Sequence, residues 1–211
     1  DVLISTNREW TPKAREIIDR RLGEAGATER TETIETATMV RPADPSKSVA
    51  RMVELKAVQA AFPIYGSVDL EGGPKYTHAL LAGHGALVRP ELLTTLDLNV
   101  GDQLVIGQAT FTIRGVIAKE PGRGAGQFNL GPRVIVDYDD LASTELLGFG
   151  SRASRVLLVR VPDDRTEALV RDLRQELRAE FANARSYRST DDRLGRNFDR
   201  AENYLSLVGL I

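Results

Sequence analysis

Cysteine is absent from this chain of 211 residues, and histidine is nearly so, with two copies. The lack of cysteine excludes disulfides, thiolate catalysis and cysteine metal sites, but it is compatible with any redox compartment. An excess of one charge is missing as well, because 28 basic residues face 30 acidic ones and the net charge is −2. We therefore expect no nucleic-acid partner and no recruitment by an anionic membrane surface.

The motifs of common enzyme classes are also missing. The sequence has no Walker-type glycine-rich lysine loop and no Gly-x-Ser-x-Gly nucleophile motif. The string GRGAG at residues 122–126 superficially resembles a dinucleotide loop, but no helix start follows it. We therefore expect no enzyme activity and no cofactor. We interpret the glycine-rich residues 121–129 as a contact loop that exposes Arg123, Gln127 and Phe128.

Metal and acid/base sites find little support in the sequence. His78 and His84 are six residues apart, which puts them on different faces of a helix, and no acidic residue stands between them. A zinc site or an acid/base pair would need a carboxylate from elsewhere in the chain. Asp137, Asp139 and Asp140 lack the EF-hand spacing and more simply open a helix. We expect no metal site.

The opening of the chain predicts the order strand, helix, strand, strand. Residues 2–6 form a β-rich run, and Thr11 followed by Pro12 predicts the capped start of a helix that ends near Gly26. Residues 28–40 and 49–60 are the two further strands.

The middle of the chain is β-rich, with frequent glycine and proline. A hairpin is predicted around Gly107, between residues 103–106 and 109–118, because apolar and polar residues alternate there. A short helix is expected at Pro90, and residues 133–136 form another strand.

The first pattern then returns. Residues 155–161 predict a strand, and Asp164 and Glu167 have the spacing of a capping box for a following helix. The apolar face of that helix is spaced by four and comprises Leu169, Leu173, Leu177 and Phe181. A short strand near residues 185–188 closes this part.

These patterns predict an α+β fold in which one split αβ domain holds an inserted β-rich domain. We expect the αβ domain at residues 1–66 and 151–189 and the insertion at residues 67–150.

Residues 190–211 predict a stalk helix with a heptad-like stripe formed by Leu194, Phe198, Ala201 and Leu205. The stripe leads into the apolar residues 204–211, and eight residues are too few to cross a bilayer, which takes about 20. One interpretation is the beginning of a truncated transmembrane helix, and the other is a terminal helix buried in the core. The lack of an initiator methionine and of a signal peptide indicates a fragment or a processed product.

Several segments, in order along the chain, resemble one known family. They are AFPIYG at residues 61–66, LVRPELL at 87–93 with Leu96 and Leu98, VGD at 100–102, FTIRGV at 111–116, PRVIV at 132–136, Asp140 and Leu141, GSR at 150–152, and NFDRAENYL at 197–205. The chain is similar to the periplasmic core domain of MacB/FtsX-type ABC-transporter permeases, in particular the YbbP-like branch.

The resemblance implies a porter-like αβ subdomain with an inserted, Sabre-like β-rich subdomain, lying between two membrane helices on the extracytoplasmic side. It also implies a second permease copy as homodimer partner, a cytoplasmic ATPase subunit, and an external partner protein or hydrophobic substrate. The domain would transmit ATP-driven motion of the membrane helices outward. The alternative is a soluble αβ domain that binds or converts a small molecule.

Overall fold

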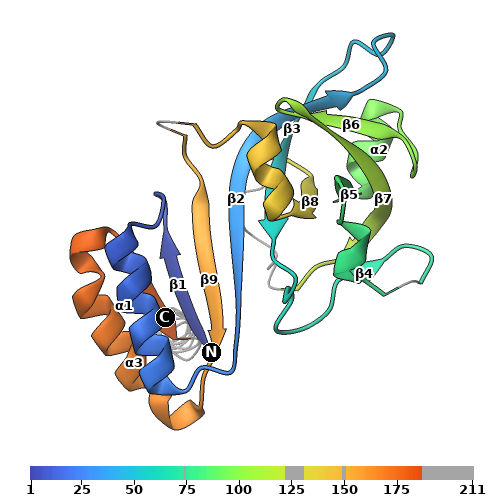
Figure 1. Ribbon diagram of the computed structural model, residues 1–211. Coiled ribbons are helices and arrows are strands. Elements are labelled where there is room, and N and C mark those ends of the chain that lie inside the picture. The colour runs from blue at the N-terminus through green and yellow to red at the C-terminus, as the bar shows by residue number, and fades with distance from the viewer. Residues whose placement is uncertain (74, 122–130, 149–150, 187–211) are drawn as a thin grey trace, which may run out of the picture. The chain divides into compact units, whose positions relative to one another are not determined.

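The computed structural model describes residues 1–211 with the exception of residues 74, 122–130, 149–150 and 187–211 (Figure 1). The fold is mixed α/β, and the chain groups into two compact units. An αβ unit comprises residues 1–6, 10–29 and 158–211, and a β-rich unit comprises residues 7–9 and 30–157. Each unit is described by itself.

The αβ unit combines strands with two helices that pack on each other. Strands β1 (Val2–Thr6) and β10 (Asn183–Ser186) pair antiparallel, with Val2 opposite Ser186. Helices α1 (Pro12–Ala25) and α3 (Asp163–Glu176) lie side by side next to β1 (Figure 1). Strand β9 (Ser154–Arg160) ends in this unit. The apolar core of the unit includes Ile4, Ile18, Leu22, Leu169 and Leu173.

The caps predicted for α1 are confirmed. Thr11 is its N-cap, with the hydroxyl oxygen accepting the backbone N–H of Ala14 at 3.0 Å, and Pro12 opens the helix. Gly26 ends it in the left-handed conformation, at φ 70°. That conformation costs glycine no steric penalty, which is why the helix stops there.

Two predictions for α3 are wrong. The N-cap is Pro162 and not Asp164, and no side chain caps the helix, because Glu167 instead accepts a hydrogen bond from the Ser186 hydroxyl at 2.9 Å. Phe181 is 67% exposed although Leu177 is buried. The reason is that α3 ends at Glu176 and a 3₁₀ turn, η3 (Arg178–Glu180), follows, so the spacing by four no longer places residues on one face.

The strands of the β-rich unit pair into a closed ring. Strand β2 (Glu29–Pro42) pairs with β3 (Arg51–Val58), and β3 pairs with β8 (Arg133–Asp137). The ring continues through β5 (Gly85–Val88), β7 (Ala109–Lys119) and β6 (Gln103–Ile106). It closes because β6 pairs with β2 through Val40 and Ile106. The predicted hairpin around Gly107 is the β6–β7 pair.

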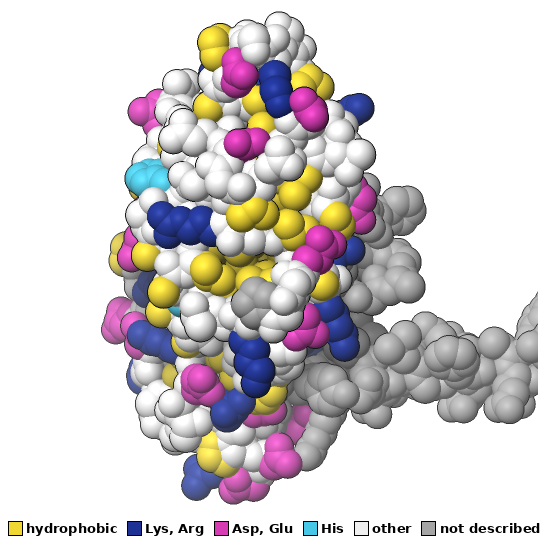
Figure 2. All heavy atoms as spheres, turned by 90° about the vertical axis from the view of Figure 1, so that its right-hand side faces the viewer, with side chains coloured by type: hydrophobic (Ala, Val, Ile, Leu, Met, Phe, Trp, Pro, Cys, Tyr) yellow, Lys and Arg dark blue, Asp and Glu magenta, His cyan; other side chains and the backbone are white. Residues whose placement is uncertain are grey.

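Side chains fill the interior of this small barrel, as expected for so few strands. Its fully buried residues include Val53, Leu55, Leu104, Phe111 and Val134, and helix α2 (Pro90–Leu96) contributes Leu92 and Leu96. A second apolar cluster, with Leu81, Leu87 and Ile135, forms on the outer face near strand β4 (Asp69–Leu70) and the turn η1 (His78–Leu80). On the side of β7 and β4, charged side chains of both signs surround a group of apolar ones (Figure 2).

The grouping by contacts differs from the boundaries expected at residues 67 and 150. Residues 30–66 group with the β-rich unit. The physical reason is the barrel, because β2 and β3 are two of its strands. They pair with β6 and β8, which lie within the expected insertion.

Candidate functional site

Two groups of residues that the sequence singled out, the contact loop and the stalk stripe, lie outside the described part of the chain. This holds for Arg123, Gln127 and Phe128 of the contact loop and for Leu194, Phe198, Ala201 and Leu205 of the stalk stripe. Close to the two ends of the loop, Glu120 precedes Pro121 and Arg133 opens β8, and both belong to a group of charges of which Lys56, Glu120 and Arg133 are buried. We call Glu35, Glu54, Lys56, Glu120 and Arg133 the base cluster.

Strand register brings most of the base cluster together. On β2 and β3, Glu35 lies directly opposite Lys56, and on β3 and β8, Glu54 lies directly opposite Arg133. Residues directly opposite on paired strands are close enough to interact through their side chains. Because alternate residues face opposite sides of a strand, Glu54 and Lys56 point away from the barrel interior that holds Leu55.

Glu120 is the centre of the cluster. Its Oε1 lies 2.8 Å from the Lys56 ammonium, and its Oε2 lies 3.4 Å from Nε of Arg133. The Arg133 guanidinium also lies 3.3 Å from Glu35 and 3.6 Å from Glu54. The side chains of Glu120, Arg133 and Lys56 are only 3%, 7% and 10% exposed. The ion pair between Glu120 and Arg133 therefore joins the two ends of the contact loop in a largely buried setting.

The balance of charge in the base cluster is three carboxylates to two cations. Burial alone would raise the pKa of Glu35, but Lys56 and Arg133 outweigh it and hold that pKa below its ordinary value. Lys56 also makes a cation–π contact, with its Nζ 4.8 Å from the centre of the Phe62 ring. The two cations thus favour the ionised form of Glu35 despite its partial burial.

His78 lies beside a carboxylate that comes from a distant part of the chain and that the sequence alone did not place near it. Its Nε2 lies 3.0 Å from Oδ2 of Asp137, and its Nδ1 lies 3.2 Å from the Tyr76 hydroxyl. Burial, followed by the nearby charge of Asp137, raises the pKa of Tyr76 far above its ordinary range, so its hydroxyl stays protonated. With both ring nitrogens bonded, His78 is a satisfied structural histidine.

His84 lies beside Ser143 and Asp140, the residue types of a hydrolytic triad. Its Nε2 is 3.1 Å from the Ser143 hydroxyl, but its Nδ1 is 3.8 Å from Asp140, beyond hydrogen-bond range. Ser143 donates to the backbone carbonyl of Asp140 at 2.6 Å, within the turn η2 (Asp139–Thr144). A catalytic serine needs its proton directed at the histidine, so this geometry does not activate it.

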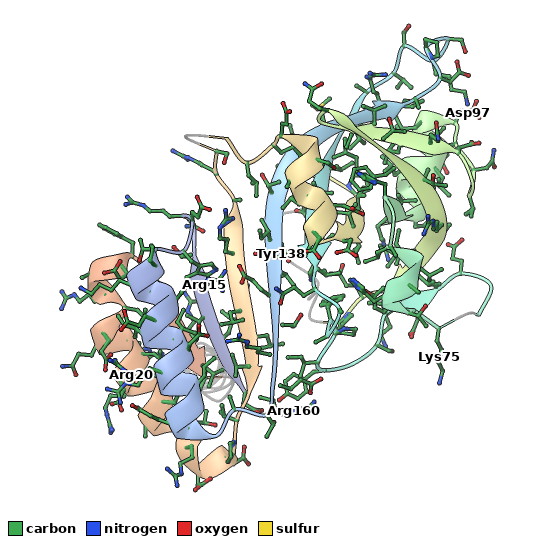
Figure 3. All side chains as sticks on the ribbon, viewed as in Figure 1. Arg15, Arg20, Lys75, Asp97, Tyr138 and Arg160 are labelled. Atoms are coloured by element: carbon green, nitrogen blue, oxygen red, sulfur yellow. The ribbon has the colours of Figure 1, made fainter. Side chains whose placement is uncertain are left out.

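Metal ligands do not converge in the described residues, where no group of three histidine, aspartate or glutamate side chains could hold an ion. Asp137, at the end of β8, and Asp140, in η2, accept hydrogen bonds from the backbone instead. Asp137 accepts the N–H of Asp139 at 3.0 Å, and Asp140 accepts that of His84 at 2.8 Å. Nearby, the Tyr138 hydroxyl, on the residue labelled in Figure 3, donates to Glu32 at 2.9 Å.

Sequence reasoning missed the base cluster. The signal for it was the alternation of Glu54 and Lys56 with apolar residues along β3, which also suits an ordinary solvated strand face. Only the pairing of β3 with β8 brings Arg133 to that face, because Arg133 is 79 residues along the chain from Glu54. Sequence spacing alone does not predict such a pairing.

Comparison with known proteins agrees with the fold. Residues 5–176 match the family described as MacB-like periplasmic core domain. The chain belongs to this family. The resemblance seen in the sequence is thereby confirmed.

Relatives of this family with solved structures share the fold at low sequence identity. The periplasmic region of MacB from Actinobacillus actinomycetemcomitans aligns with a TM-score of 0.58 at 11% identity, covering 92% of each chain. The extracellular domain of the noncanonical ABC-type transporter YknZ from Gram-positive bacteria aligns with a TM-score of 0.57 at 12% identity, covering 88% of this chain and all of that one.

A curated relative extends well beyond this domain. The chain is 29% identical over 164 residues to an uncharacterized ABC transporter permease, YbbP, of Escherichia coli K12. The match covers 76% of the chain but only 19% of that relative's length. Among the described residues, no helix has both the length and the apolar character needed to cross a membrane.

Proposed function

We propose that this chain is the extracytoplasmic domain of an ABC-transporter permease, and that it transmits ATP-driven motion of membrane helices to a substrate or partner protein outside the membrane. The observation that carries the proposal is the family match over residues 5–176. The role is mechanical and not catalytic, in line with the geometry of His84 and Ser143.

The pairing of β1 with β10 supports this role. Val2 and Ser186 are direct neighbours although the whole described chain separates them. The backbone nitrogen of Asp1 lies 3.3 Å from the Val159 carbonyl oxygen, and the Asp1 carboxylate accepts the N–H of Val161 at 3.2 Å. We propose that membrane helices flank this domain in the longer protein, so that both would connect to one edge of the αβ unit.

The path of the chain gives the proposal a mechanical basis. The chain passes from the αβ unit to the β-rich unit within β2, after Glu29, and returns within β9, after Leu157. Strands resist extension because each is already nearly fully extended. Motion that reaches the αβ unit can therefore be carried to the β-rich unit along these two strands.

The base cluster suits an output at the contact loop. Glu120, directly after β7, and Arg133, at the start of β8, hold the described strands on either side of the loop together through a buried ion pair, which is costly to separate. We propose that Arg123, Gln127 and Phe128 contact the external partner or hydrophobic substrate. A second permease copy and a cytoplasmic ATPase subunit complete the assembly.

Charged substitutions in the predicted stalk stripe test the proposal. Phe198→Asp and Leu205→Asp should leave the melting temperature of the isolated chain nearly unchanged, because the stripe has no membrane partner there. In the assembled transporter each change buries an unpaired charge and should uncouple the domain from the ATPase. Arg196→Asp, on the opposite face of the predicted helix, is the matched control.

The absence of cysteine supplies the readout. A single cysteine at Phe128 can be labelled with a maleimide in the assembled transporter, with and without ATP and vanadate. We expect the labelling rate to depend on nucleotide, and Phe198→Asp to remove that dependence while Arg196→Asp preserves it. If the stalk is unchanged and the labelling rate is the same with and without nucleotide, the transmission role is refuted.

A further inference from the structure

Residues from two distant parts of the chain line one cavity of the β-rich unit. The cavity has a volume of about 780 Å³. Small-molecule sites typically have volumes of roughly 300–1,000 Å³. The lining comes from residues 7–9 and from residues 147, 148, 151, 153 and 155, all of which belong to the β-rich unit. We call it the Arg155 cavity.

The later part of this lining is anchored to the barrel. Ala153 is buried in the apolar core, and Leu147 packs against the same core. The hydroxyl of Thr36, on β2, donates to the backbone carbonyl of Arg152 at 3.1 Å. The apolar part of the cavity wall is therefore held in position by the fold itself, which lowers the cost of ordering a site when a ligand binds.

Two opposite charges line the Arg155 cavity without pairing. Arg155 is half-buried and Glu9 is exposed. Within the described part of the chain, the side chains of these two residues form no ion pair, either with each other or with a third group. A half-buried guanidinium has given up part of its hydration and gained no partner in return. A ligand with an anionic group supplies that partner.

We propose that the Arg155 cavity binds a zwitterion of the α-amino-acid type, either a free amino acid or a short peptide. The ligand carboxylate pairs with Arg155, whose planar fork of N–H donors matches two carboxylate oxygens, and Arg8 adds a second cation to the lining. The ligand ammonium group pairs with Glu9. Asn7 and Ser151 supply further hydrogen-bonding groups.

The charges of the lining favour a zwitterion over a singly charged ligand. An anion alone leaves Glu9 without a partner and places a second negative charge in the same cavity. A cation alone leaves Arg155 half-buried and unpaired. Specificity arises in this way whenever the wrong ligand leaves a charged group of the site unsatisfied. The apolar part of the wall, from Leu147 and Ala153, contacts the ligand's side chain.

Titration calorimetry of the 211-residue chain tests the proposal, with alanine and trialanine as the two probes. The tighter probe is then compared with its C-amidated and N-acetylated forms, each of which lacks one charge. We expect amidation to weaken binding about tenfold, because the carboxylate meets a half-buried guanidinium. Acetylation should weaken it about threefold, because Glu9 is exposed and its ion pair is screened by water.

Two variants assign the charges to residues. Arg155→Gln should abolish the difference between the free and the amidated probe, and Glu9→Gln should abolish the difference between the free and the acetylated probe. Arg51→Gln and Glu71→Gln are the matched controls, because both residues are exposed in the same unit and lie outside the cavity lining. Circular dichroism melts verify that each variant is folded.

The inference is overturned if neither probe binds, if the modified probes bind as tightly as the free one, or if the controls weaken binding as much as Arg155→Gln. It does not rest on the proposed function, because the transmission role is tested at the stalk and the contact loop. A failed titration would leave that role standing, and a stalk variant that transmits normally would leave the cavity as a ligand site.

Discussion

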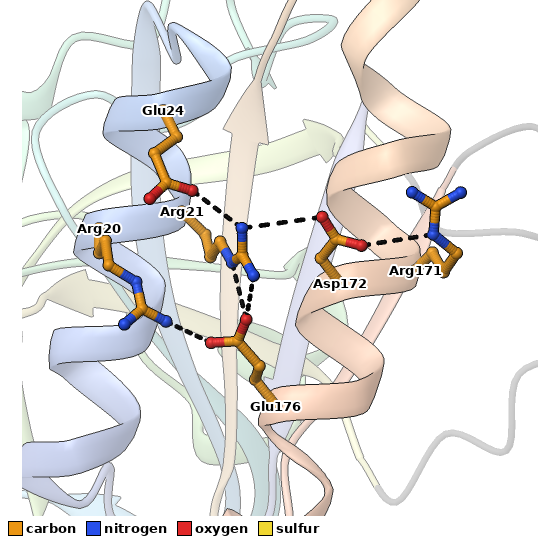
Figure 4. Close-up of polar contacts among 6 residues, drawn as sticks. All are labelled: Arg20, Arg21, Glu24, Arg171, Asp172 and Glu176. Carbon is orange, nitrogen blue, oxygen red and sulfur yellow. Dashed lines mark hydrogen bonds and ion pairs between the residues drawn. The ribbon is translucent and has the colours of Figure 1, made fainter.

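The two units use the same ionic groups in opposite ways. In the αβ unit, arginines 20 and 21 of α1 meet Glu176 of α3, and Arg21 also meets Glu24 and Asp172 (Figure 4). The hydrogen bonds that Arg21 makes with Glu176 and Glu24 raise the pKa of its guanidinium. These side chains lie at the surface, where water and salt weaken ion pairs.

In the β-rich unit three of the corresponding groups, Lys56, Glu120 and Arg133, are buried in the base cluster, where little water is available to replace a lost partner. The number of ion pairs in a unit therefore says little about how much each pair stabilises the fold. A surface network between two helices adds to packing that already exists, whereas a buried network on a barrel face constrains which segments can lie there.

Separating the two units by deletion should have the largest effect. Removal of residues 30–157, with Glu29 joined to Leu158, should leave a folded αβ unit, since the backbone N–H of Thr28 already donates to Arg160 at 3.1 Å and the two ends are close. Removal of residues 67–150 should instead yield an unfolded or aggregated chain, because it leaves β2 and β3 without the rest of the barrel. Circular dichroism and size-exclusion chromatography distinguish the outcomes, and a well-folded product of the second deletion would contradict the barrel as a unit.

Loss of one buried carboxylate is the next largest effect. Glu120→Gln should lower the free energy of unfolding by about 3 kcal/mol, because Lys56 and Arg133 keep their charges in a buried site and lose the most deeply buried of their carboxylate partners. Glu176→Gln is the matched control at the surface and should shift the urea midpoint only slightly, with no shift at all in about 1 M salt, where the Debye length is short. Similar losses for both variants would remove the distinction between the two networks.

Two glycines, one in each unit, differ in how much stability an alanine in their place should cost. Gly107, at φ 57°, is so placed that an added Cβ would lie 2.0 Å from the Thr144 carbonyl oxygen, so Gly107→Ala combines strain with a backbone clash. We expect a loss of about 2 kcal/mol or more in urea unfolding. Gly26, at φ 70°, has open space around it, and Gly26→Ala should cost about 1 kcal/mol from strain alone. Equal losses of stability for the two variants would mean that η2 shifts at little cost to make room for the added methyl group.

The smallest expected effect is a dependence on pH. Because the pKa of Glu35 is lowered on folding, its contribution to stability is fully present above its ordinary value of 4.5 and is lost as the pH falls through the lower folded value. Urea unfolding between pH 6 and about 3 should therefore show a steeper loss for the natural chain than for Glu35→Gln. Parallel curves would show that Lys56 and Arg133 do not stabilise the ionised form.

Local features were predictable from the sequence. The caps of α1 at Thr11 and Gly26 and the hairpin around Gly107 each depend on a few adjacent residues, and all three are confirmed. The family was also accessible, because its motifs recur in order along the chain. The expectation for Phe181 failed because periodicity does not reveal where a helix ends.

Long-range pairing was beyond the reach of local patterns. The ring closes through β6 and β2, where Val40 meets Ile106, and nothing in either short strand specifies the other. The base cluster depends on the same kind of pairing, as does the meeting of His78 with Asp137, 59 residues away. Register decides these contacts, and register is set by the assembled sheet.

The neighbouring positions of β1 and β10 bear on how the molecule acquires its structure during synthesis. The barrel is encoded within residues 30–157, so it can form while the following residues are still being made. The first strand must wait for Ser186, its partner at Val2, and the loop between them is among the longest that the described chain can close. Until then the apolar face of α1, with Ile18 and Leu22, has no helix α3 to cover it. We expect the αβ unit to be the last to fold and the segment around α1 to be the binding site for a holding chaperone.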